Sequence, residues 1–173
     1  MSVFGTKIDT TMSDTRQLWI RPELADRIRQ HGVETYPYEC CGALLGRDRG
    51  FFAAGSNASE QKIEREALAL FPLVNRREDS PRNRFSVTAE DVRDAEKAAN
   101  HQGLDVIGWY HSHPDHPAQP SDYDRDHAWP WYSYIIVSVH AGSAKDMTSW
   151  RLKDDRSGFV EEKIEVLKAN AAD

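Results

Sequence analysis

The stretch LDVIGWYHSHPDHPAQPSDYD, residues 104–124, contains the pattern that decides the fold. Its first half is a mostly apolar run of strand length, and Pro114 ends that run because proline has no N–H to donate. Side chains alternate between the two faces of a strand, so His111 and His113 point the same way and Ser112 points the opposite way. We therefore expect a buried strand that ends in two neighbouring imidazoles.

A serine and a carboxylate follow the two histidines after a proline-rich turn. Ser121 and Asp124 have the spacing of a helix N-cap, which would fix the backbone that aims the carboxylate. With His111 and His113, Asp124 offers two nitrogens and a carboxylate oxygen, a set that suits zinc with a fourth position left to water. The same ligand types could hold ferrous iron. Ordinary polar surface at a strand end is the other interpretation of the two histidines.

The whole string, H-S-H-P followed by six residues and S-x-x-D, resembles the signature of the JAMM (MPN-plus) zinc metalloproteases position for position. That family also uses a catalytic glutamate before a strand of small residues. The segment PYECCGALLG at 37–46 resembles this second element, with Glu39 in the place of the glutamate. The resemblance implies one Zn²⁺ per chain, with His111, His113 and Asp124 as its ligands. It also implies that Glu39 and Ser121 are catalytic residues.

One domain of mixed α and β structure is expected. The chain has 173 residues, 39% of them hydrophobic, which is enough for one core and too few for two domains. Strand-like and helix-like segments alternate, which indicates an α/β or α+β sheet flanked by helices. The resemblance sharpens this to a curved mixed sheet of the MPN/JAMM (cytidine-deaminase-like) type with a long helix on each side. We predict a flexible arm at 1–15, the metalloprotease domain at 16–155 and a C-terminal helix or tail at 156–173.

Local patterns predict most of the individual elements. Strands are expected at 18–20, 43–45, 67–74, 85–87, 134–139 and 149–153, and helices at 22–32 and 88–103. Residues 127–131 are expected to finish a short helix, and 46–50 to form a turn. The strand at 149–153 is expected at an edge of the sheet. Val160, Ile164 and Leu167 lie on one side of a helical pattern and predict the C-terminal helix or frayed tail.

Composition excludes several classes of function. Lys and Arg number 22 against 28 Asp and Glu, and the net charge of −6 argues against a nucleic-acid binder that follows phosphates. Cys40 and Cys41, the only cysteines, are adjacent and offer no disulfide framework, which favours a reducing compartment. We interpret them as core residues rather than ligands. No apolar run has the length of a membrane helix or a signal core, so we expect a cytoplasmic protein without membrane contact. Nothing in the sequence indicates an oligomeric state.

Glu39 is the candidate general base. It directly precedes an apolar strand, where partial burial would raise the pKa of its carboxyl toward the range of a base, although a solvated loop glutamate is the alternative. The resemblance implies that Glu39 moves the proton of a zinc-activated water and that Ser121 donates to the oxyanion. The remaining charged residues near the signature lack the family spacing and are expected to be bystanders: Asp115, His116, Asp122, Asp126 and His127. In family members that act on ubiquitin-like proteins, the region of the four arginines at 75–84 lies near the substrate groove.

The resemblance implies a ubiquitin-like or sulfur-carrier protein as substrate, cleaved at a peptide or isopeptide bond after its Gly-Gly tail. Members that recognise ubiquitin chains carry a long insert after the ligand aspartate. Here nine residues separate Asp124 from Tyr134, which is typical of the compact prokaryotic type. Two other functions stay open, a non-catalytic MPN-like interaction scaffold and a metal hydrolase that acts on a small amide.

Overall fold

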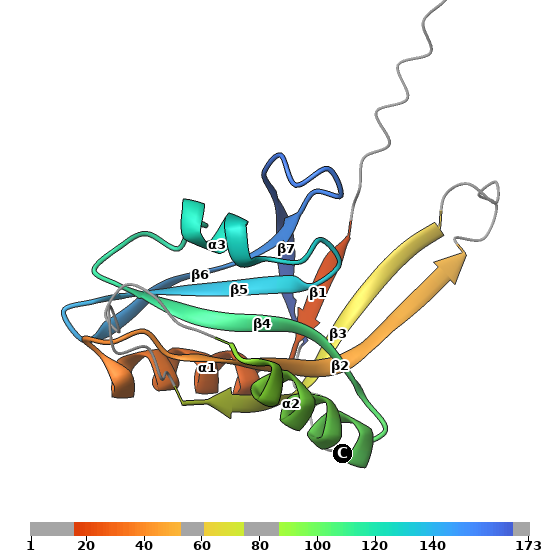
Figure 1. Cartoon of the computed structure of the whole chain (residues 1–173), viewed down its shortest axis with the longest axis horizontal. Helices are drawn as coiled ribbons and strands as arrows, with labels where there is room; N and C mark the ends of the chain where they lie inside the picture. The colour runs from red at the N-terminus through yellow and green to blue at the C-terminus, as the bar shows by residue number, and fades with distance from the viewer. Residues whose placement is uncertain (1–15, 53–60, 75–86, 168–173) are drawn as a thin grey trace, which may run out of the picture.

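The computed structural model describes residues 16–52, 61–74 and 87–167 (Figure 1). In chain order the elements are β1 (Gln17–Ile20), α1 (Pro22–Thr35), β2 (Cys41–Phe52), β3 (Gln61–Leu73), α2 (Ala89–His101), β4 (Asp105–Pro114), α3 (Asp122–His127), β5 (Ser133–His140), β6 (Ser143–Leu152) and β7 (Phe159–Val166). The predicted arm at 1–15, the arginine-rich segment 75–84 and most of the strand predicted at 85–87 lie outside the described residues. Within the described ranges, no helix combines the length and the apolar character needed to span a membrane.

The strands form one closed, curved sheet in the order β1-β3-β2-β4-β5-β6-β7. The sheet is mixed, because β1 runs parallel to β3 and β7, β4 runs parallel to β5, and the remaining pairs are antiparallel. This confirms the predicted curved mixed sheet. The long β2–β3 hairpin and the central position of β4 can be followed in Figure 1.

The two long helices pack in different core clusters, on the two faces of the sheet. Alternation along β4 divides the core, with Trp109 in one cluster and its neighbour Tyr110 in the other. Helix α1 packs in the cluster of Tyr110 through Ala25 and Ile28, which are fully buried. Helix α2 packs in the cluster of Trp109 through two small buried residues, Ala95 and Ala99. The predicted helix on each side of the sheet is thus confirmed.

Two glycines that sequence reasoning interpreted as chain breaks lie inside regular elements. The helix end predicted at Gly32 is wrong, because α1 continues past it. A Cβ at Gly32 would lie 3.0 Å from Val139 Cγ2, so the glycine allows close packing of α1 on β5. The turn predicted at 46–50 is also wrong, because β2 runs through this segment. A Cβ at Gly46 would lie 1.9 Å from the carbonyl oxygen of Glu66, so this glycine permits a close approach of β3.

The prediction of a C-terminal helix or tail at 156–173 is wrong for the described part of this segment, because residues 159–166 form the strand β7. β7 pairs antiparallel with β6 and parallel with β1, so it closes the sheet. Val160 and Ile164 fit a helical spacing, but the free edges of β6 and β1 offer backbone hydrogen-bond partners that no local pattern reveals. The strand predicted at 149–153 is part of the longer β6, and the expectation that it lies at an edge is wrong for the same reason.

Candidate metal centre

The two histidines of the signature lie at the C-terminal end of β4. His111 is 1% exposed and His113 is 8% exposed, and their Nε2 atoms are 3.1 Å apart. Ser112 points to the opposite face, where its Oγ accepts a hydrogen bond from the amide of Cys40 at 2.8 Å. The predicted arrangement of these three side chains on the strand is confirmed. The cause is local, since a strand fixes the face of every side chain.

Asp124 reaches the histidines from α3. Its Oδ1 lies 3.1 Å from His111 Nε2, and its Oδ2 lies 3.5 Å from His113 Nε2. Ser121 is the N-cap of α3, and its Oγ accepts a hydrogen bond from the amide of Asp124 at 3.1 Å. In return, Asp124 Oδ2 accepts hydrogen bonds from the amide and the hydroxyl of Ser121, both at 2.7 Å. The predicted cap is confirmed, and it orients the carboxylate.

The donor atoms of these three residues fit a zinc ion. All of them lie within 4.8 Å of one another. Two ligands of a tetrahedral zinc ion are about 3.3–3.5 Å apart, because each lies about 2.0–2.2 Å from the metal. The separations of 3.1 and 3.5 Å between Asp124 and the two histidines are close to this value. His113 Nδ1 lies 2.8 Å from the carbonyl oxygen of Pro117, a hydrogen bond that leaves Nε2 free to bind a metal.

The protonation states also suit metal binding. Burial lowers the pKa of His111 despite the nearby charge of Asp124, so the imidazole is neutral. Burial alone would raise the pKa of Asp124, but the hydrogen bonds from both histidines and from the amide of Ser121 hold this pKa well below its usual value. A neutral imidazole and an ionised carboxylate are the forms that coordinate a metal.

Glu39 lies on the same face of the sheet as the histidines. The antiparallel register places Cys41 of β2 opposite His111 of β4. Beyond this ladder, the amide of Ser112 donates to the carbonyl oxygen of Cys40 at 3.1 Å. The same register continued by one more pair brings Glu39 beside His113. Glu39 is 4% exposed, which confirms its predicted burial. Its role as a base stays a prediction.

The electrostatic environment of Glu39 favours the protonated form. Burial raises the pKa of the Glu39 carboxyl to about 9, and the negative charge of Asp124 adds to this shift. The neighbouring Cys40 and Cys41 are buried in different core clusters, as predicted. Burial raises the pKa of both thiols to about 12, so neither supplies a thiolate ligand.

The rival aspartates do not join the group of possible metal ligands. Asp115 accepts hydrogen bonds from the hydroxyl of Tyr36 at 2.8 Å and from the amide of Ala141 at 3.0 Å. Asp122 and Asp126 are exposed on α3. In the part of the chain that the structure describes, Asp124 is therefore the aspartate that the fold brings to the two histidines, as the spacing predicted.

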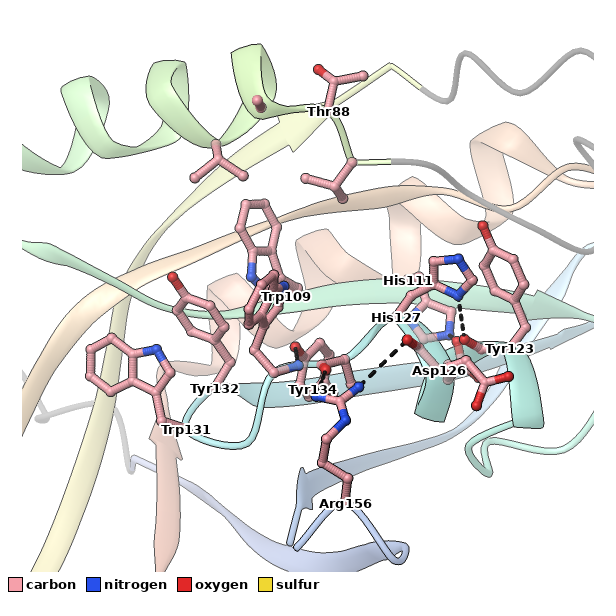
Figure 2. A pocket seen from close by; sticks show the side chains of 16 residues that line it. Thr88, Trp109, His111, Tyr123, Asp126, His127, Trp131, Tyr132, Tyr134 and Arg156 are labelled. Atoms are coloured by element: carbon pink, nitrogen blue, oxygen red, sulfur yellow. Dashed lines mark hydrogen bonds and ion pairs between the residues drawn. The ribbon is translucent and has the colours of Figure 1, made fainter. Parts of the chain in front are cut away.

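Sequence reasoning missed a groove of about 840 Å³ beside the donor cluster (Figure 2). His111 and Asp124 lie among its lining residues, and Trp109 of β4 and Thr88 before α2 also contribute. Much of the remaining wall is aromatic, with Tyr123, Trp129, Trp131, Tyr132 and Tyr134. Most of the lining side chains come from the start of α2, from β4, α3 and β5, and from the connection between α3 and β5, so no single periodic pattern could reveal the groove.

Trp129 and Trp131, which line this groove, lie in the turn between α3 and β5 rather than in a helix. The prediction that residues 127–131 finish this helix is wrong beyond His127, because α3 ends there and Ala128 is extended. Pro130 disfavours helical geometry for the residue before it, which is the local reason. Trp129 and Trp131 are consequently 64% and 62% exposed, so both rings are available to a ligand.

The fold and the donor cluster define a protein of the JAB/MPN class. The chain belongs to the family of prokaryotic homologs of the JAB domain, which it matches over residues 21–153. It is 31% identical over 119 residues to desampylase of Haloferax volcanii, an alignment that covers 68% of this chain and 75% of that protein. The family resemblance is confirmed, and the match to desampylase supports a hydrolase of the JAB type.

Solved structures and a phage protein extend the comparison. A solution structure from Salinibacter ruber is 41% identical, with a TM-score of 0.62, and one from Desulfitobacterium hafniense is 26% identical, with a TM-score of 0.70. Each alignment covers 88% of this chain and 94% of the other. Tail tip assembly protein K of Escherichia phage N15 is 29% identical over 130 residues, and the alignment covers 73% of this chain but 43% of that protein.

Proposed function

We propose that this protein is a zinc-dependent peptidase that cleaves a peptide or isopeptide bond after the C-terminal tail of a ubiquitin-like or sulfur-carrier protein. The observation that carries the proposal is the cluster of His111, His113 and Asp124, with the buried Glu39 on the same face of the sheet. The name of the relative, desampylase, supports a small protein modifier as the substrate. We also propose a cytoplasmic location, which the two free cysteines support.

Glu39 would carry the proton during the reaction. Zinc held by the three ligands would supply a Lewis acid and an activated water at neutral pH. A positive charge in the donor cluster also lowers the pKa of Glu39, so the carboxylate can accept a proton from the attacking water. The same carboxyl then delivers this proton to the amine nitrogen as the C–N bond breaks. Burial helps the second half of this cycle, because it keeps water away from the proton.

Ser121 is proposed to act in two ways. Its amide N–H donates to Asp124 Oδ2 at 2.7 Å, which holds the carboxylate toward the histidines. Its hydroxyl also donates to this oxygen. A hydroxyl has one proton to donate, so the proposed hydrogen bond to the oxyanion requires the Ser121 hydroxyl to turn from Asp124 to the substrate.

The aromatic groove offers a place for the tail of the substrate. His111 and Asp124 line it, so a peptide that lies in it would reach two of the proposed metal ligands. An extended tail with apolar side chains would cover the exposed rings of Trp129 and Trp131, and such burial is favourable. The short connection from α3 to β5 agrees with a compact modifier as the substrate.

Metal content and tail cleavage test this function together. We expect about one zinc per chain by mass spectrometry, and cleavage of a ubiquitin-like protein fused through its C-terminal tail to a reporter. Glu39→Gln should keep the zinc and lose activity by about 10²–10⁴-fold, the usual contribution of a general base. Glu34→Gln, an exposed carboxyl on α1, is the matched control and should be fully active.

The two alternatives predict other outcomes. A wild-type protein that takes up no zinc, even when zinc is added, would be a scaffold rather than a hydrolase. A zinc-loaded protein that cleaves small amides but leaves the protein tail intact would be the small-amide hydrolase.

A further inference from the structure

Helix α3 carries a proposed metal ligand but has little to hold it in place. It is six residues long and has no buried residue. Helices shorter than about 12–15 residues are marginal in water unless tertiary contacts stabilise them. The cap formed by Ser121 and Asp124 is internal to the helix, so it cannot fasten α3 to the sheet. Apart from the contacts of Asp124 itself with His111 and His113, the position of α3 therefore depends on contacts between its far end and the rest of the fold.

Arg156 supplies such a contact from the connection between β6 and β7. Its Nη1 donates to the carbonyl oxygen of Ala128 at 3.0 Å, and its Nη2 lies 3.5 Å from the carbonyl oxygens of Arg125 and Asp126. The last carbonyls of a helix have no partners within the helix, and a cation is favourable at that end. In Figure 2, Arg156 reaches from the β6–β7 connection toward α3 at the edge of the groove.

The turn that presents Arg156 is itself well defined. The backbone of Arg156 is left-handed, with φ of 59°, and its amide donates to the carbonyl of Lys153 at 2.8 Å. The amide of Lys153 donates to the carbonyl of Gly158 at 2.9 Å, and the amide of Ser157 donates to Asp155 Oδ1 at 2.9 Å. The strands on either side of this turn belong to the closed sheet. The backbone that carries the guanidinium is therefore held in place by these hydrogen bonds and by the sheet, whereas α3 has no buried residue to hold it.

We propose that Arg156 is a positioning residue that fastens the C-terminal end of α3 to the β6–β7 turn and so holds Asp124 at the metal site. The inference rests on the proposed function in one respect, that the donor cluster binds zinc. Apparent zinc affinity falls in proportion to the fraction of molecules in which Asp124 is in place. A second tether remains without Arg156, because the amide of Trp129 donates to the hydroxyl of Tyr134 at 2.7 Å. The expected loss of affinity is therefore partial.

The test compares zinc affinity, measured by competition with a chromophoric chelator, in three variants. Arg156→Ala should weaken zinc binding about 10-fold, at the lower end of the effect of outer-shell partners. Arg156→Lys should restore part of the affinity, because an ammonium donates to carbonyls without the fork of the guanidinium. Arg125→Ala is the control, since its ion pairs with Asp122 and Asp126 stay within α3, and it should bind zinc like the wild type.

Hydrogen exchange of the α3 amides in chelator-treated protein gives a readout that does not depend on zinc or on activity. Arg156→Ala should speed exchange at residues 125–128 and leave exchange in β4 unchanged. If the wild type binds no zinc, the proposed function fails, and the exchange rates still decide whether Arg156 fastens α3. Unchanged exchange in Arg156→Ala, or faster exchange with unchanged zinc affinity, would overturn the positioning role.

Discussion

The candidate metal centre takes its ligands from two supports of very different strength. β4 pairs with β2 on one side and β5 on the other, and every residue from Val106 to Pro114 is buried. α3 has no buried residue and depends on a cap and on hydrogen bonds at its far end. The histidines are thus placed by the core, and the aspartate is placed by a few polar contacts. A site built in this way loses its geometry first on the side of α3.

Removal of a ligand from each support is expected to have the largest effect. His111→Ala and Asp124→Ala should each weaken zinc binding by at least about 10³-fold, more than the 10–100-fold effect of an outer-shell change. The free energy of unfolding of the chelator-treated protein should separate the two. His111→Ala leaves a cavity in a packed strand and should cost about 2–4 kcal/mol. Asp124→Ala leaves the N-cap Ser121 in place but removes the carboxylate half of the capping box, and should cost about 0.5–1 kcal/mol. Equal losses in urea unfolding would mean that α3 is as firmly held as β4.

The packing of β4 can be tested without touching a ligand. A Cβ at Gly108 would lie 2.2 Å from the backbone carbonyl oxygen of Ser133 in β5, so Gly108→Ala must displace one strand. We expect a loss of about 1–3 kcal/mol in urea unfolding, the usual cost of overpacking. Gly158→Ala in the β6–β7 connection is the matched control, because no atom lies within 4 Å of its Cβ position. Its free energy of unfolding should change by less than about 0.5 kcal/mol.

The pH dependence of stability tests the environment of Glu39 beside β4. The pKa of this carboxyl is raised from 4.5 to about 9, so the folded protein retains a proton that the unfolded chain releases between these values. Its contribution to stability is therefore complete below about pH 4.5 and is lost as the pH rises toward 9. Glu39→Gln has no carboxyl that titrates, so its stability should not fall for this reason as the pH rises. In chelator-treated protein we expect the variant to gain about 1–3 kcal/mol over the wild type near pH 9, and little below pH 5. A stability advantage of Glu39→Gln that does not change with pH would contradict the raised pKa of Glu39.

The candidate site was predictable where one short segment carried the information. Alternation along β4 was enough to place His111 and His113 on one face. The spacing of Ser121 and Asp124 predicted the cap of α3, in which the Ser121 hydroxyl accepts a hydrogen bond from the amide of Asp124. The proximity of Glu39 to this group was available only through the family resemblance, since no local rule relates residues so far apart in the chain.

The sequence by itself thus determined which face each side chain takes and where several elements begin, because backbone geometry fixes these features within a few residues. Tertiary structure alone decided that residues 159–166 close the sheet as β7, although their spacing suggested a helix. It also decided that Gly32 and Gly46 serve close packing rather than chain reversal. Tertiary structure alone likewise decided the aromatic groove and the contact of Arg156 with α3. Each depends on which distant segments meet, and that is set by the pairing of strand edges and the packing of the whole core.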